Sequence, residues 1–124
     1  MSLRVLIVDD SSAMRTYVRA TLEDHLSLQV EEATNGFEAL RMLPRERFDL
    51  VLIDVNMPNI NGLELVSFMR RSELHKDTPL ILVSTEASTR DREKAFKLGA
   101  TAYLAKPFTQ EELLEVLAPY AKRE

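Results

Sequence analysis

Short apolar runs alternate with longer amphipathic stretches along the whole chain. Three of the runs are entirely apolar and rich in β-branched residues, which is typical of strands buried on both faces. Two further runs mix apolar and polar residues, as strands at the edge of a sheet do. We predict buried strands over residues 5–8, 50–53 and 80–83, and edge strands over residues 28–33 and 101–105.

Five amphipathic stretches follow the predicted strands, and several carry start or stop signals for a helix. Ser11 or Ser12 can cap the first helix. Thr109 and Glu112 stand at capping-box spacing at the start of the last helix, and Pro119 is expected to end or kink it. We predict helices over residues 13–26, 35–43, 62–74, 88–99 and 109–124.

This strict alternation of strands and helices predicts an α/β fold with a parallel sheet covered by helices on both faces. Right-handed crossovers limit the possible strand orders. With the two mixed strands at the edges, the order becomes 2-1-3-4-5, which is the flavodoxin-like (βα)5 arrangement. We expect residues 1–124 to form one domain of this kind.

Composition narrows the possible functions. The net charge is −4 and no run of lysine and arginine exceeds two residues, which argues against a nucleic-acid or membrane-surface partner. The chain has no cysteine, so disulfides and thiolate metal sites are excluded. No apolar run approaches the roughly 18 residues of a membrane span, and no signal peptide precedes Arg4. A cytoplasmic protein is the resulting prediction.

Polar side chains follow four of the predicted strands at the points where these strands end. Asp9 and Asp10 follow the first strand, Asp54 the third, Ser84 the fourth and Lys106 the fifth. In an open parallel sheet, ligands bind beyond the carboxyl ends of the strands. We therefore expect three carboxylates, a hydroxyl and an ammonium to converge on one edge of the sheet.

This combination indicates metal-assisted phosphoryl transfer. Clustered carboxylates repel one another unless a cation lies among them, and an all-oxygen donor set suits Mg²⁺. A lysine and a hydroxyl beside the metal can neutralise a phosphoryl group while a carboxylate attacks it. Asp54 is the candidate nucleophile, which would form an aspartyl phosphate.

Each of these residues also has a structural explanation when it is taken alone. Asp9 or Asp10 could cap the first helix, Asp54 could cap a loop, Lys106 could be a solvated charge, and Ser84 could be a satisfied hydroxyl at a strand end. Their joint occurrence at four strand ends favours a site. His25 and His75 fall at predicted helix ends, and we expect both on the surface with no role as metal ligand or phosphodonor.

The sequence resembles the response-regulator receiver domain of two-component signalling, and in particular the single-domain chemotaxis (CheY-like) type. The resemblance covers essentially the whole chain. It rests on the segments "VLIVDDSSAMR", "EEATNGFEAL", "DVNMPNINGLEL", "VSTEA" and "GATAYLAKPF", in this order.

The resemblance implies a set of site residues. Asp54 is the phosphoacceptor for a histidine kinase, and Mg²⁺ is the cofactor. The metal is held by Asp10 and Asp54, by Asp9 mainly through bound water, and by the main-chain carbonyl of Asn56. Lys106 contacts the phosphoryl group and precedes a cis peptide bond to Pro107.

A second group of residues is implied to carry the signal and set its lifetime. The Ser84 hydroxyl moves to the phosphoryl oxygen, and Tyr103 is the aromatic switch that turns inward in response. Asn56 and Glu86 tune dephosphorylation. The face made by the fourth helix, the fifth strand and the fifth helix then changes its affinity for an output partner, with the flagellar switch as the expected one.

Several alternatives stay open at this stage. The chain could be a receiver module of a longer regulator with a transcriptional or enzymatic output, and it could be a monomer or dimerise on phosphorylation. A phosphatase of the haloacid-dehalogenase type would need an Asp-x-Asp spacing where this chain has adjacent aspartates. A flavodoxin would need a phosphate-cradling first loop, and "VDDSS" is acidic and lacks glycine. On the receiver interpretation, the chain catalyses only its own phosphorylation and dephosphorylation.

Overall fold

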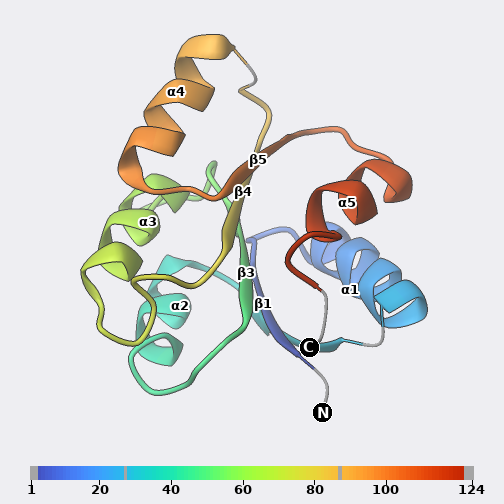
Figure 1. The fold of residues 1–124 in the computed structure, drawn as a ribbon, viewed down its shortest axis with the longest axis horizontal. Helices are drawn as coiled ribbons and strands as arrows, with labels where there is room; N and C mark the ends of the chain where they lie inside the picture. Colours follow the sequence, from blue (N-terminus) through green and yellow to red (C-terminus); the bar gives the residue numbers. More distant parts are fainter. Residues whose placement is uncertain (1–2, 27, 87, 122–124) are drawn as a thin grey trace.

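The computed structural model describes residues 3–26, 28–86 and 88–121, and it confirms the predicted alternation of strands and helices. Each strand is followed by one helix (Figure 1). The elements are β1 (Arg4–Val8), α1 (Ser12–Leu26), β2 (Gln29–Ala33), α2 (Gly36–Met42), β3 (Leu50–Asp54), α3 (Gly62–Arg71), β4 (Leu80–Ser84), α4 (Thr89–Leu98), β5 (Ala102–Ala105) and α5 (Gln110–Leu117).

The sheet has the predicted order, β2-β1-β3-β4-β5, with all neighbouring strands parallel. The three fully apolar strands lie in the centre and the two mixed strands lie at the edges. The strands are in step at their carboxyl ends, where Val8 pairs with Ile53 and Ser84 pairs with Ala105. The residues that follow β1, β3, β4 and β5 are therefore brought to the same edge of the sheet.

Helices cover both faces of the sheet, with α1 and α5 on one side and α2, α3 and α4 on the other (Figure 1). Each layer has its own apolar core. On the first side Leu22 and Leu113 are fully buried against the sheet, and on the second side Leu65 and Met69 are. Burying one such side chain contributes about 1.5–3 kcal/mol, so both helix layers hold the strands in place.

The helix ends follow the predicted capping chemistry. Thr109 and Glu112 form the predicted capping box at the start of α5, and α5 ends two residues before Pro119. Asn61 and Glu64 form a second capping box at the start of α3. Gly99 ends α4 with a φ of 119°, a conformation that favours glycine. None of the described helices is long and apolar enough to cross a membrane.

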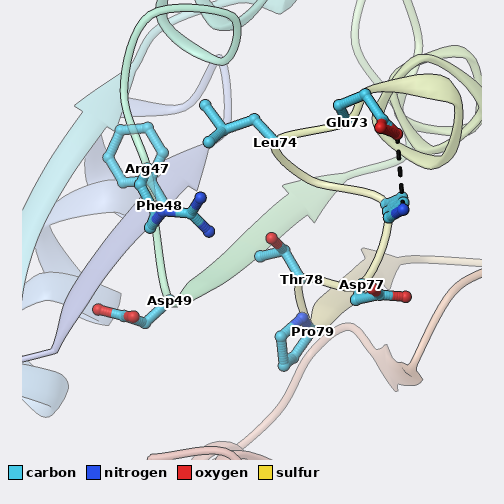
Figure 2. A pocket seen from close by; sticks show the side chains of 9 residues that line it. Arg47, Phe48, Asp49, Glu73, Leu74, Asp77, Thr78 and Pro79 are labelled. Carbon is cyan, nitrogen blue, oxygen red and sulfur yellow. Dashed lines mark ion pairs between the residues drawn. The ribbon is translucent and has the colours of Figure 1, made fainter.

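The loops that enter β3 and β4 form a pocket at the amino ends of these strands (Figure 2). Asp49 and Asp77 point away from each other across Pro79, and Glu73 pairs with Lys76 at 3.5 Å. The charged groups here do not converge on one point. The convergent charges lie at the opposite, carboxyl edge of the sheet.

His75 lies in the interior beside this pocket, so the prediction of a surface position is wrong. Its Nε2 lies 2.9 Å from the carbonyl oxygen of Leu43 and 3.0 Å from that of Glu46, and both of these can only accept a hydrogen bond. Its Nδ1 lies 3.1 Å from the hydroxyl of Thr78, and its ring stacks on Phe48. His75 thus joins the loop after α2 to the loop after α3.

Arg70 joins the same region to the end of α4. Its guanidinium donates to the carbonyls of His75 at 3.0 Å, Thr78 at 2.8 Å and Gly99 at 2.9 Å. Burial lowers the pKa of Arg70, because the charge is partly removed from water. The amino edge of the sheet is therefore held by side chains that bind main-chain carbonyls.

We expect His75→Leu to lower the free energy of unfolding by about 1–3 kcal/mol, because two buried carbonyls lose their donor. The matched control is His25→Ala on the exposed end of α1, which should change stability by less than about 0.5 kcal/mol. Urea unfolding of both variants measures the difference. Equal stabilities of the two variants would contradict the bridging role of His75.

Candidate functional site

Three carboxylates meet at the carboxyl edge of the sheet, as predicted. Asp9 follows β1 and is 4% exposed, Asp54 ends β3 and is 3% exposed, and Asp10 is exposed to solvent. One carboxylate oxygen from each of the three lies within 4.8 Å of the others. The in-step pairing of β1 with β3 produces this juxtaposition, because it places the ends of the two strands side by side.

Lys106 bridges the two buried carboxylates. Its Nζ donates to Asp54 Oδ1 at 3.1 Å and to Asp9 Oδ2 at 3.5 Å. Lys106 enters from the loop after β5, and its peptide bond to Pro107 is cis. Main-chain N–H groups add further donors, from Ser11 to Asp9 at 2.9 Å and from Asn56 to Asp54 at 3.1 Å.

The electrostatics of the edge favour an additional cation. Burial raises the pKa of Asp9, and the neighbouring charge of Asp54 raises it further. The N–H of Ser11 and the ammonium of Lys106 act in the opposite direction without reversing the shift. When all three aspartates are ionised, one ammonium leaves two negative charges uncompensated.

The donor set fits Mg²⁺. Carboxylate oxygens are hard ligands, and Mg²⁺ is usually bound through one or two of them together with water. Asp10 is exposed and faces the cluster from the solvent side, while Asp9 and Asp54 form its buried floor. The first helix is capped by Ser11, whose Oγ accepts the N–H of Met14, so neither aspartate is needed as the cap.

Arg15 is a site residue that the sequence analysis did not identify. Its guanidinium donates to the main-chain carbonyl of Asp9 at 2.8 Å and to Glu32 at 2.7 Å. It thereby fastens the loop that carries the aspartates to β2. The signal in the sequence was weak, because an arginine within a helix is usually a surface charge.

Gly62 allows α3 to pass close to the end of β3. A Cβ at this position would lie 2.7 Å from the carbonyl oxygen of Asp54 and 2.8 Å from the Cα of Val55. Both of these are main-chain atoms, so they could move only by displacing the strand end. A glycine here therefore helps to fix the position of the Asp54 carboxylate.

Ser84 and Tyr103, the two residues predicted to form the switch, are joined to the loops after β3 and β4. Ser84 is fully buried, donates its hydroxyl hydrogen to Asn56 Oδ1 at 3.2 Å, and accepts the N–H of Glu86 at 2.9 Å. Tyr103 is 8% exposed, its hydroxyl donates to the carbonyl of Glu86, and the Arg92 guanidinium lies 5.1 Å from its ring centre. The ring of Tyr103 is thus buried, and its hydroxyl joins β5 to the loop after β4.

The fold and this edge together define a class of α/β domain with a buried acidic cluster and a lysine at the carboxyl ends of a 2-1-3-4-5 sheet. Residues 5–118 match the family described as the response regulator receiver domain. The chain belongs to this family. It is 41% identical over 116 residues to a "Chemotaxis protein CheY homolog" of Campylobacter jejuni, which covers 93% of this chain and 89% of the relative.

Solved structures give the same result. The chemotaxis response regulator CheY4 of Vibrio cholerae superposes with a TM-score of 0.91 at 39% identity, covering 97% of this chain and 99% of that one. The receiver domain of a sensor histidine kinase from Pseudomonas aeruginosa has a TM-score of 0.87 at 30% identity and covers 98% of both chains. That structure is described as having a magnesium ion coordinated in the active-site cleft.

We expect Asp9→Asn to stabilise the protein at pH 7 in buffer that contains a chelator. Folding raises the pKa of Asp9 above 3.8, so ionising this carboxyl lowers the free energy of unfolding. The loss is absent below pH 3.8 and develops as the pH rises through the raised pKa. An amide side chain cannot ionise, so the Asp9→Asn variant avoids this loss. The difference in stability between the variant and the wild type should therefore shrink toward acid pH. Urea unfolding across the pH range measures the effect.

The control for this experiment is Asp24→Asn on the exposed side of α1, which should change stability by less than about 0.5 kcal/mol at any pH. If Asp9→Asn is less stable than the wild type at pH 7 without metal, the ionised Asp9 stabilises the fold, which contradicts the prediction.

Proposed function

We propose that this receiver domain accepts a phosphoryl group on Asp54 from the phosphohistidine of a histidine kinase, with Mg²⁺ as cofactor. The observation that carries the proposal is the position of Asp54 itself. Its carboxylate is buried at the end of the central strand, 3.1 Å from the ammonium of Lys106 and within the acidic cluster. We propose that residues 1–124 form one receiver domain.

The chain's own residues supply the nucleophile and the charge stabilisation. A carboxylate oxygen of Asp54 attacks phosphorus, and a P–O bond forms while the P–N bond to the kinase histidine breaks. The electron pair of that bond leaves with the imidazole nitrogen. Lys106 then donates to the phosphoryl oxygens instead of to the free carboxylate. Mg²⁺ held by Asp9, Asp10, Asp54 and the Asn56 carbonyl would neutralise charge on those oxygens.

In dephosphorylation a water oxygen attacks phosphorus and the bond between phosphorus and the Asp54 oxygen breaks. The electron pair of that bond stays on the Asp54 carboxylate, and inorganic phosphate leaves after the water has lost a proton to solvent. Asn56 and the exposed Glu86 flank the approach to Asp54 and are proposed to orient or exclude this water. The reaction restores the chain, and no separate substrate is turned over. The protein thus catalyses changes of its own side chain and is not an enzyme in the usual sense.

The signal is proposed to reach the surface through β4 and β5. The Ser84 hydroxyl moves to the new phosphoryl oxygen, and the loop after β4, including the Glu86 carbonyl bound by Tyr103, moves with it. The face formed by α4, β5 and α5 then changes shape. To invert a population from 1:99 to 99:1, phosphorylation must favour the active state by about 5.5 kcal/mol.

Chemotaxis is the proposed pathway, because the relative from Campylobacter and the structural neighbour from Vibrio are both named as chemotaxis proteins. A component of the flagellar switch is then the output partner at the α4-β5-α5 face. We propose a cytoplasmic protein that is monomeric before phosphorylation.

Incubation with Mg²⁺ and acetyl phosphate should add one phosphoryl group to the wild-type protein and none to Asp54→Ala. Intact mass spectrometry measures the adduct, and hydroxylamine should remove it, as it does other acyl phosphates. A chelator should prevent its formation, because the acidic cluster then lacks its cation. An adduct of equal yield on Asp54→Ala would overturn the assignment of the phosphoacceptor.

The output face can be tested with a purified flagellar-switch component from the same organism. Acetyl phosphate with Mg²⁺ should increase its affinity for the wild-type protein in a binding titration. Phe96→Ala on α4 removes a half-exposed aromatic ring, and it should weaken this binding while leaving phosphorylation of Asp54 unchanged. Affinity that does not respond to phosphorylation would contradict the chemotaxis assignment and leave the receiver chemistry intact.

A further inference from the structure

We propose that the Asn56 side chain is a latch that holds the switch hydroxyl of Ser84 in the resting state, so that phosphorylation must break their hydrogen bond before the signal can leave the site. The inference rests on the proposed function, because it needs a phosphoryl group on Asp54. It assigns Asn56 a positioning role that is distinct from the control of water during dephosphorylation.

The geometry around Asn56 joins the phosphoacceptor to the end of β4. Its main-chain N–H donates to Asp54 Oδ1 at 3.1 Å, and its side-chain Oδ1 accepts the Ser84 hydroxyl at 3.2 Å. The same Oδ1 lies 3.4 Å from both the N–H and the hydroxyl of Thr85. One carbonyl oxygen is therefore the acceptor for the three donors that the turn after β4 presents to it.

Ser84 cannot serve Asn56 and a phosphoryl group at once. A serine hydroxyl has a single hydrogen to donate. Its oxygen accepts the N–H of Glu86 at 2.9 Å, which holds the hydroxyl in place, and the residue is completely buried. Any contact of this hydroxyl with a phosphoryl oxygen must therefore replace the bond to Asn56.

Tyr103 is joined to the same turn. Its ring is buried and its hydroxyl is bound to the carbonyl of Glu86, whose N–H is the donor to the Ser84 hydroxyl. The hydrogen of that hydroxyl is donated to Asn56. A shift of Ser84 toward Asp54 therefore breaks the bond to Asn56 and moves the residue that holds Tyr103, so the Ser84–Asn56 bond is the contact to be exchanged.

The test is a double-mutant cycle with beryllium fluoride, a phosphoryl mimic that binds a carboxylate without being hydrolysed. Isothermal titration calorimetry at saturating Mg²⁺ gives its affinity for the wild type, Asn56→Ala, Ser84→Ala and the double variant. Because the readout is an equilibrium, the access of water to a phosphoryl group does not affect it. Urea unfolding checks that all four proteins are folded.

We expect Asn56→Ala to bind beryllium fluoride about 2- to 10-fold more tightly than the wild type, which is the range for the loss of one hydrogen bond from the resting state alone. In the Ser84→Ala background the same substitution should tighten binding less, because no hydroxyl remains to be held, and the difference between the two effects measures the latch. The contacts of Oδ1 with Thr85 are present in both backgrounds, so their contribution cancels in the cycle.

Two results overturn the latch. One is weaker binding by Asn56→Ala than by the wild type, and the other is an equal change in both Ser84 backgrounds, which would place the effect in the metal site or in Thr85. If the wild type itself does not bind beryllium fluoride with Mg²⁺ present, the proposed phosphoacceptor function fails first, and the latch fails with it.

Discussion

The burial of two carboxylates at the ends of adjacent strands is the constraint on which the rest of this molecule depends. Two like charges removed from water destabilise a fold unless other groups compensate them. Asp9 and Asp54 receive this compensation from Lys106 and from main-chain N–H groups. These compensating groups are also what a phosphoryl group requires. The arrangement that compensates the buried charges is therefore the one that the proposed phosphoryl transfer uses.

The architecture follows from the sequence because it depends on patterns that act over a few residues. Short, fully apolar runs rich in β-branched residues favour central strands, and alternation with amphipathic helices favours a parallel sheet. Parallel pairing then brings the residues after β1, β3, β4 and β5 together, so the acidic cluster could be predicted from strand ends alone. The resemblance to receiver domains added the roles of the individual residues, and not the fold.

Features that depend on contacts between distant loops were beyond the sequence. His75 looks like a surface residue at a helix end, yet it is buried because two carbonyl groups about 30 residues earlier lie within reach of its ring. Tyr103 is buried with its hydroxyl bound to the Glu86 carbonyl in the loop after β4, and no local pattern in the sequence indicates this contact. Arg15 likewise contacts main-chain and side-chain groups that no local pattern reveals.

Asn56 contacts Asp54 through its backbone and Ser84 through its side chain. A substitution at this position keeps the first contact, which any residue except proline can make, and changes the second. In the proposed mechanism, signal duration and response threshold are therefore both set by the side chain at this position. A substitution that changes how long the signal lasts would also change the response threshold. A second substitution at another position, such as Ser84, would be needed to change one trait without the other.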